Sequence, residues 1–392
     1  MIRVGFTLIG GGDWTGGRNY LQNLVSVLGR FQKDRLTPIL FVGDICGTDD
    51  VGAFADIPGL ELVKTPLLNV ARRSSSLAQA LMLGCDVDLM RLFRKHSVDL
   101  IFESAQFFGW RLGIPAIAWI PDFQHRALPQ LFSRSAWWKR EIGFRVQVSS
   151  GRTIMLSSDD ARYECERYYP ATRGRTRAVH FAVPPGPETD GTHARKIAES
   201  YGLLSPFFFM PNQFWRHKNH DLVLDALNLL RIRGRQVIVA ASGRQHDPRN
   251  PEHFPAFRTR LAQMGLEDNL RLLGMVPYQH LALLMRASTA MLNPSLFEGW
   301  STTVEEARSI GTPMLLSDLA VHREQMGSEA IYFNRYSARS LADALDRFVP
   351  LDEAQRVKRE QVAAKAARQR TERFSKDFVE LAEECLVRYG RS

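Results

Sequence analysis

Short apolar runs alternate along the chain with segments in which apolar residues recur every three or four positions. The runs predict strands at residues 2–9, 39–42, 99–102, 116–120, 153–156, 207–210, 237–241, 270–273, 290–292 and 314–316. The helical periodicity predicts helices at residues 19–28, 77–95, 159–168, 193–201, 222–231, 255–264 and 302–309. Such alternation indicates an α/β fold with parallel sheets that are covered by helices on both faces.

A proline-rich stretch at residues 183–187 interrupts this alternation. Proline fixes φ and removes an amide donor, so the stretch reads as a linker between two Rossmann-like domains, residues 1–184 and 185–365. The chain after residue 352 reads as two helices, and residues 366–392 are expected to pack back on the first domain. Because parallel sheets bind ligands beyond the carboxyl ends of their strands, candidate site residues are those just after strands.

Composition narrows the function. With 392 residues, 45% of them apolar, the chain is large enough for more than one core and is not a disordered protein. No apolar run approaches the roughly 18 residues of a spanning helix, and the start lacks signal-peptide features. The four scattered cysteines favour a reducing cytoplasm. A net charge of +9 favours anionic partners, but no nucleic-acid motif occurs, so nucleic acid is not expected.

The most informative segment is NPSLFEGWSTTVEEA, which begins at Asn293. Glu298 lies in a loop after a predicted strand, and Glu306 follows eight residues later in a predicted helix. The helix N-terminus suits a diphosphate, and the residues that form it are Gly299, Trp300, Ser301, Thr302 and Thr303. A capped surface helix is the plain alternative, since Thr302 and Glu305 fit a capping box. That alternative leaves Glu298 and the Gly299–Trp300 pair unexplained.

This segment resembles the E-x7-E motif of retaining GT-B glycosyltransferases, notably those of family 4. The resemblance continues through Gly311-Thr312-Pro313 and is strongest from residue 211 to residue 321. It implies two Rossmann-like domains facing each other across a cleft, with a nucleotide-sugar donor in the C-terminal domain and an acceptor mainly in the N-terminal one. It also implies that Glu306 binds the donor ribose and that Glu298 binds the transferred sugar.

Two cations follow the first predicted strand of the second domain, in PNQFWRHKNH from residue 211. Arg216 and Lys218 would neutralise a diphosphate leaving group as its bond to the sugar breaks. The alternative is a solvated basic helix start. Members of the family usually carry an arginine six residues before the lysine, where this chain has Asn212. We therefore assign the main role to Lys218, a compensating role to Arg216, and a donor contact to Asn212.

Two further loops resemble donor-binding loops of the family. Met275 and Val276 follow a predicted strand and resemble the loop that packs against the nucleobase, although a plain strand-to-helix turn explains them equally well. In the glycine-rich segment after residue 9, Gly16 and Gly17 match the loop that faces the donor phosphates. The glycine spacing fits a dinucleotide fingerprint poorly, and no P-loop motif occurs.

Asp122 and His125 follow another predicted strand, in the string WIPDFQH. A loop histidine is often a surface residue; the resemblance assigns His125 to donor-sugar or acceptor contact, and Asp122 to the same region. No metal is expected. Asp86 and Asp88 form a D-x-D sequence inside a helix-like stretch and read as a solvated face, and the histidines at 217 and 220 lack a third ligand in sequence.

The stretch from Trp137 to Arg140 mixes aromatic and basic residues. Such a stretch can lie at a membrane interface, but a helix that packs its tryptophans inside the domain is the commoner explanation. Peripheral contact with the inner membrane face is therefore kept as an alternative, and it is of most interest if the acceptor is lipid-linked.

Together these features predict a cytoplasmic, retaining hexosyltransferase of cell-surface polysaccharide synthesis. It would need no cofactor: its donor would be a GDP- or UDP-linked sugar, and its acceptor a glycan or lipid-linked hydroxyl. Mannose is suggested by residues 121–125 and 212–215, which resemble polysaccharide transferases. No covalent nucleophile stands out, so same-face attack assisted by the leaving phosphate is the hypothesis. A nucleotide-sugar epimerase and a non-catalytic nucleotide-sugar-binding protein are the alternatives; a dehydrogenase ranks last.

Overall fold

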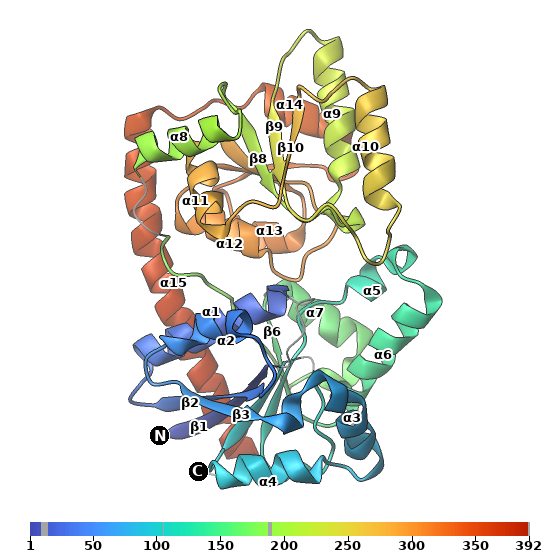
Figure 1. The fold of residues 1–392 in the computed structure, drawn as a ribbon, viewed down its shortest axis with the longest axis vertical. Coiled ribbons are helices and arrows are strands. Elements are labelled where there is room, and N and C mark those ends of the chain that lie inside the picture. Colours follow the sequence, from blue (N-terminus) through green and yellow to red (C-terminus); the bar gives the residue numbers. More distant parts are fainter. Residues whose placement is uncertain (9–14, 105, 187–189, 391–392) are drawn as a thin grey trace. The chain divides into compact units, whose positions relative to one another are not determined.

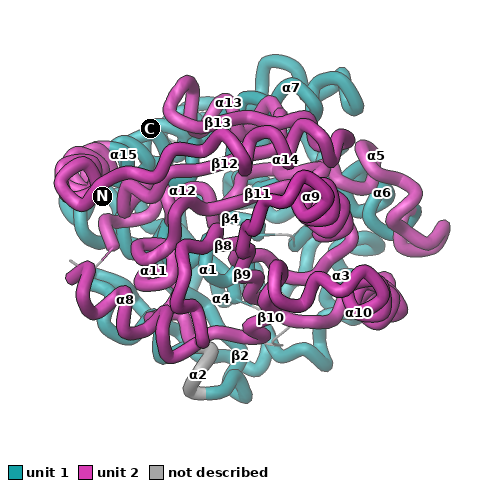
Figure 2. The backbone as a smooth tube through the Cα atoms, turned by 90° about the horizontal axis from the view of Figure 1, so that it is seen from above, with its two compact units in different colours: residues 1–122, 138–182, 370–392 teal, residues 123–137, 183–369 magenta. Residues whose placement is uncertain are grey.

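A computed structural model describes residues 1–8, 15–104, 106–186 and 190–390 of the chain. The backbone divides into two compact units, coloured separately in Figure 2. Unit 1 comprises Met1–Asp122, Trp138–Ala182 and Arg370–Ser392, and unit 2 comprises Phe123–Trp137 and Val183–Gln369. The sequence places domain boundaries after residues 184 and 365; in the structure the chain passes between the units after residues 182 and 369, and segment 123–137 clusters with unit 2.

Unit 1 is built on a parallel seven-stranded sheet of order β3-β2-β1-β4-β5-β6-β7. Its strands are β1 (Ile2–Leu8), β2 (Leu36–Gly43), β3 (Glu61–Thr65), β4 (Leu100–Ser104), β5 (Ala116–Trp119), β6 (Thr153–Leu156) and β7 (Thr176–Ala178). The helices of this half of the chain are α1 (Thr15–Phe31), α2 (Thr48–Ala55), α3 (Arg73–Met82), α4 (Val87–Lys95), α6 (Arg134–Ser149) and α7 (Asp159–Tyr168), and the 3₁₀ turns are η1 (Pro66–Leu68), η2 (Val70–Arg72) and η4 (Pro170–Thr172). Figure 1 labels most of these elements.

Unit 2 contains a parallel six-stranded sheet of order β10-β9-β8-β11-β12-β13. Its strands are β8 (Phe208–Pro211), β9 (Val239–Ser242), β10 (Leu270–Gly274), β11 (Ala290–Asn293), β12 (Met314–Ser317) and β13 (Ile331–Phe333). Its helices are α5 (Gln124–Ala127), α8 (Gly191–Ser200), α9 (His220–Ile232), α10 (His253–Gln263), α11 (Tyr278–Ala287), α12 (Thr302–Ser309), α13 (Ala320–Met326) and α14 (Ala338–Asp346), with 3₁₀ turns η3 (Pro129–Leu131) and η5 (Arg216–Lys218).

Successive residues of the unit 2 strands belong to different cores. Met210 and Leu292 pack with α9, α10 and α14 on one face, whereas Phe209 and Met291 pack with α8, α11 and α12 on the other. Side chains of a strand point alternately to opposite faces, so a strand that is apolar throughout is buried on both. The alternation of strands and helices therefore predicted the class correctly, and the α/β expectation is confirmed.

Three sequence-based expectations about local structure are wrong. The single helix expected at residues 77–95 is two helices, because Gly84 adopts a φ of +83° and the buried side chain of Asp86 accepts the first amides of α4. Asp86 is therefore not on a solvated face. The expected pair of C-terminal helices is one helix, α15 (Glu353–Arg388), drawn as a continuous rod in Figure 1. Strands β3, β7 and β13 were not expected.

Within unit 1, the last turns of α15 pack on the sheet. The ring of Phe378 lies 5.9 Å from Phe6 and 5.7 Å from Phe102, and Glu383 pairs with Arg35 at 2.8 Å.

Among the described residues, no helix is both long and apolar enough to cross a membrane.

Candidate active site

The site in unit 2 lies where the order of the sheet reverses. β8 and β11 are adjacent, and the chain leaves them toward opposite halves of the sheet, which is the position where open parallel sheets bind ligands. Leu296 donates its amide to the carbonyl of His217 at 2.8 Å, so the loops after the two strands lie side by side. Asn219, in the left-handed conformation at φ +59°, donates from its side chain to the carbonyls of Pro294 and Arg335.

These paired loops bring together two of the predicted site residues. The Lys218 Nζ lies 2.6 Å from the Glu298 Oε1, and Ser295 donates from its Oγ to the same oxygen at 2.7 Å. Both charged side chains are nearly buried, with exposed fractions of 14% and 9%. Buried ions need compensating partners, and here each ion is the partner of the other. The arrangement sets a cation and a carboxylate side by side at the carboxyl edge of the sheet.

The Glu298 loop is held by buried polar side chains. Asn293 accepts from the amide of Ser295 at 3.2 Å and donates to the Oγ of Ser301 at 3.0 Å. Gln325 clasps the main chain of Ser301, accepting from its amide at 3.2 Å and donating to its carbonyl at 3.0 Å. Ser317 donates to the carbonyl of Ser295 at 2.7 Å. Satisfied networks of this kind fix one loop geometry.

Helix α12 begins at Thr302 and carries Glu306 on its second turn. Glu306 accepts from the hydroxyl of Tyr278 at 3.4 Å, and burial raises the pKa of Glu306 to about 7. The expected capping box is wrong, because Ser301 is the cap residue and its side chain does not bond the helix amides. Glu305 is buried, and its Oε2 lies 3.7 Å from the Nη1 of Arg308. Thr302 and Thr303 occupy the first turn and are half-buried.

Arg216 and Asn212 lie on the other loop. The Arg216 amide donates to Asp247 at 3.2 Å, and hydrogen bonds from the backbone of Arg216 and Arg249 lower the pKa of Asp247 against the opposing effect of its burial. Asn212 is 2% exposed, and neither atom of its side-chain amide has a partner among the described residues. An unpaired buried amide costs about 1–3 kcal/mol, so this side chain has unused capacity to bond.

The remaining residues predicted to contact the donor differ in how exposed they are. Met275 is 65% exposed after β10, whereas the Val276 side chain packs in the core. In unit 1, Gly16 is exposed and Gly17 is buried in the first turn of α1. Residues 9–14 of the glycine-rich segment lie outside the described residues.

Part of the chain resembles a known protein family. Residues 199–370 match the family described as glycosyl transferases group 1. The similarity covers less than half of the chain and includes the loops that carry Lys218, Glu298 and Glu306. The O-antigen chain mannosyltransferase RfbU of Salmonella typhimurium is 24% identical over 155 residues, which cover 38% of this chain and 40% of that protein.

Solved structures match the chain over nearly its full length. A glycosyltransferase from Rickettsia africae matches with a TM-score of 0.71 at 14% identity, covering 98% of each chain. Anabaena HepE, in complex with UDP and glucose, matches with a TM-score of 0.72 at 16% identity, covering 98% of this chain and 100% of its own. Sequence identities this low show the fold alone. That fold is GT-B, as the motif resemblance implied.

Arg249 contacts segment 123–137 within unit 2. The Arg249 guanidinium lies 5.3 Å from the ring of Phe132 and 5.1 Å from that of Trp215, and it donates to the side chain of Gln124 at 2.8 Å. His125 is fully buried in this segment, packed against Phe132 and Trp137. The predicted contact residue His125 therefore belongs to the unit that carries Lys218 and Glu298.

Asp122, in contrast, is the last residue of unit 1 before this segment and pairs with Arg140 at 2.5 Å.

The expectation that both tryptophans pack inside the domain holds for one of them. Trp137 donates its indole N–H to the carbonyl of His125 and packs inward, whereas Trp138 is 56% exposed.

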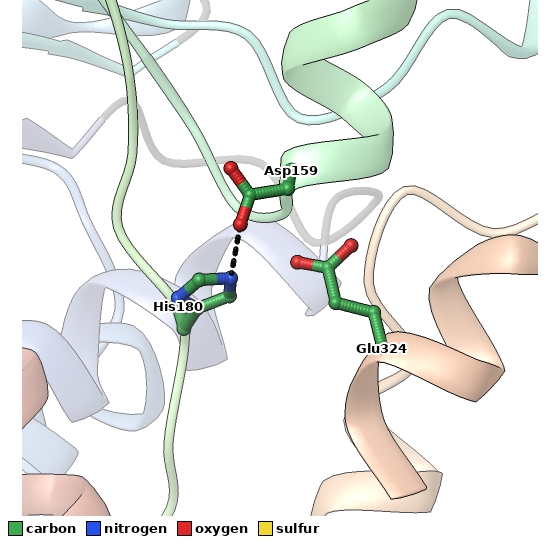
Figure 3. Close-up of side chains that lie close together, drawn as sticks. All are labelled: Asp159, His180 and Glu324. Carbon is green, nitrogen blue, oxygen red and sulfur yellow. Dashed lines mark ion pairs between the residues drawn. The ribbon is translucent and has the colours of Figure 1, made fainter. Parts of the chain in front are cut away.

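Two groups of side chains bear on metal binding. His220 is fully buried and stacked on Phe214 at 4.2 Å, and burial lowers its pKa to about 3, so it is a neutral core residue. Figure 3 shows Asp159 at the start of α7 and His180, whose Nε2 lies 3.5 Å away within unit 1. The third side chain drawn, Glu324, is on α13 of unit 2, and we derive no metal site from groups on separate units.

Several supporting residues of the candidate site were missed by sequence reasoning. The buried His322 lies 3.0 Å from the carbonyl of Ser317, which only accepts, so its Nδ1 carries the proton; burial lowers its pKa to about 4. Asp247, Arg249 and Gln325 support the loops from distant elements. The spacing of residues along the sequence does not identify these three residues, since each contacts the loops only after folding.

Proposed function

We propose that this glycosyltransferase moves a hexosyl group from a nucleoside-diphosphate sugar to a hydroxyl acceptor with retention of configuration. The observation that carries the proposal is the pair of Lys218 and Glu298, placed at the reversal point of the unit 2 sheet and followed by Glu306 eight residues later. The name of the Salmonella relative supports mannose as the sugar, and a GDP or UDP carrier is the corresponding donor. A glycan or lipid-linked acceptor of cell-surface polysaccharide synthesis fits the same relative.

Each proposed contact follows from the charge and position of its residue. The diphosphate would lie at the first turn of α12, against the amides of Thr302 and Thr303, where the helix dipole favours negative charge. Lys218 would contact the phosphates, with Arg216 as a second cation. Glu298 would accept hydrogen bonds from sugar hydroxyls, and the ionised Glu306 would accept two from the ribose.

Other contacts would complete the donor site. Asn212 would use its unpaired amide on the donor, the exposed side chain of Met275 and the main chain of Val276 would meet the base, and the loop residues Gly299, Trp300 and Ser301 would line the phosphates. Further donor or acceptor contacts are proposed at His125 in unit 2 and at Gly16, Gly17 and Asp122 in unit 1.

In the proposed reaction, the bond between the anomeric carbon and the phosphate oxygen breaks, and its electron pair leaves with the diphosphate. The acceptor oxygen bonds to the same face of the sugar, and its proton passes to the departing phosphate oxygen. Lys218 would stabilise the growing negative charge on that phosphate, an effect that is strong in a water-excluded site. The Lys218–Glu298 pair would hold the ammonium in position before the donor arrives.

The test is a transfer assay on the full chain. Purified protein is incubated with GDP-mannose, UDP-glucose and related donors plus candidate acceptors, and nucleoside diphosphate release and the product anomer are followed by NMR. We expect acceptor-dependent release with one donor and a product of the donor's own configuration. Lys218→Ala and Glu298→Gln should abolish release, whereas the exposed-residue controls Lys196→Ala and Glu267→Gln should not. An inverted product would refute retention, and full activity in Lys218→Ala would refute the assigned site.

A further inference from the structure

A pocket in unit 1 lies outside the residues discussed so far. It has a volume of about 100 Å³, several times the roughly 10–15 Å³ that one water requires. Its lining comes from η1, from α3, and from the segment after β4, so it lies at the carboxyl ends of β3 and β4, the edge at which parallel sheets bind ligands. The residues that matter to the argument are Leu67, Leu68, Arg73, Leu77, Phe107 and Phe108.

The pocket has a rigid base. Phe107 covers the guanidinium of Arg152 at 4.8 Å, and that guanidinium pairs with the buried Glu103 at 2.5 Å. Glu103 also accepts the amide of Phe108 at 3.0 Å. Two consecutive aromatic residues are thus fixed from below by a buried, hydrogen-bonded ion pair. The pocket is therefore preformed, which reduces the entropy cost of binding.

The lining of the pocket includes one cationic side chain, that of Arg73. Arg72 and Arg73 are adjacent, but they differ in their partners. Arg72 pairs with Asp88 at 2.6 Å and lies 3.9 Å from Asp86, so its charge is used within the fold. Arg73 is exposed at the start of α3 and lines the pocket, and its guanidinium has no hydrogen bond or ion pair with any residue within the described ranges. A guanidinium in this situation is suited to bind a phosphate from solution.

Exposed apolar side chains also occur in the lining and near it in the sequence. Leu77 lines the pocket and is 45% exposed, and Leu81, one turn later, shares its face of α3. Met82, Leu83 and Trp110 are also exposed, and the Trp110 ring lies 5.0 Å from that of Phe107. Several exposed apolar side chains within one short helix and its end favour an interaction site. A hydrated sugar would gain little from contact with these apolar side chains.

We propose that this pocket binds an amphiphilic acceptor, with a phosphate at Arg73 and an apolar chain along Leu77 and the exposed face of α3. The inference rests on the proposed glycosyltransferase function and selects a lipid-linked phosphate over a free glycan as the acceptor class. Charge complementarity fixes the polarity of binding, because the cation stands at the start of α3 and the exposed apolar residues follow toward its end.

Farnesyl phosphate, below its micelle concentration, is the probe. Its binding to the full chain is measured by titration calorimetry, with farnesol and inorganic phosphate as the arms that lack the phosphate and the chain. We expect farnesyl phosphate to bind more tightly than either. Arg73→Ala should weaken farnesyl phosphate binding about tenfold and leave farnesol unchanged. Leu77→Gln should weaken both, and the control Arg91→Ala, an exposed cation of α4, should change neither.

The outcomes separate this proposal from the proposed function. Equal binding of farnesyl phosphate and farnesol, or wild-type binding in Arg73→Ala, overturns the anionic subsite. Unchanged binding in Leu77→Gln overturns the apolar track, and stronger binding of a phosphate-free glycan overturns the acceptor class. The same samples are tested for stabilisation by nucleoside diphosphates: if a nucleotide binds and farnesyl phosphate does not, the inference fails while the donor site stands.

Discussion

Glu306 provides the most quantitative prediction, because its carboxylate is costly to the fold. Burial raises its pKa from 4.5 to about 7, so the folded protein holds this proton more tightly than the unfolded chain does. Stability therefore falls as the pH rises from 4.5 to 7 and levels off above that. At roughly 1.4 kcal/mol per pH unit, the ionised side chain costs about 3 kcal/mol at pH 8. Glu306→Gln should remove that cost.

The assay is urea unfolding of the wild type and of Glu306→Gln from pH 4.5 to pH 8.5. We expect equal stability at pH 4.5 and a variant more stable by up to about 3 kcal/mol at pH 8. The exposed control Glu267→Gln should show no such pH-dependent difference. The same Glu306→Gln variant should lose nucleotide affinity, which is the pattern of a residue kept for function at the expense of stability. A flat difference across pH, or a less stable variant at pH 8, would refute the reasoning.

Three further predictions concern supporting residues. Arg249→Ala removes two cation–π contacts, so amide hydrogen exchange in segment 123–137 should rise about tenfold, measured by mass spectrometry; unchanged exchange would show that Arg249 does not anchor it. Gln325→Ala leaves the Ser301 amide without its partner and should cost about 1–3 kcal/mol in urea unfolding, with a loss below 0.5 kcal/mol arguing against the clasp. His220 has a pKa of about 3, below its ordinary 6.5, so stability should fall as the pH drops from 6.5 toward 3; His220→Gln should show a shallower fall, and an equal slope would assign the acid sensitivity elsewhere.

The sequence supports the fold where the local signal and the tertiary environment agree. Strands such as Thr153–Leu156 and helices such as Asp159–Tyr168 have the predicted bounds, because a fully apolar run and a capped periodic segment each fit one structure. The missed strands β3 and β13 are short and partly exposed, so they lack a continuous apolar run. The long α15 was split in prediction, although no glycine or proline interrupts it.

The candidate site shows a similar division. Lys218 and Glu298 were both selected from sequence, since each follows a strand, but their 2.6 Å contact depends on the adjacency of β8 and β11. The residues that hold these loops, such as Gln325 and Asp247, could not be found from spacing, because they come from distant elements. Segment 123–137 is a further case: it contacts Arg249, which lies more than a hundred residues away in the sequence.

The measurement that tests the central claim most directly is nucleotide binding by the purified chain. GDP, UDP, ADP, TDP and their common sugar conjugates are compared by thermal shift and calorimetry. At about 100 times its dissociation constant, a ligand adds roughly 2.7 kcal/mol of stability, which both methods detect. We expect one nucleoside diphosphate to bind the wild type and the control Lys196→Ala, and to bind neither Lys218→Ala nor Glu306→Ala. A folded sample that binds none of these nucleotides, or a Lys218→Ala variant that binds as tightly as the wild type, would contradict the assignment of the donor site.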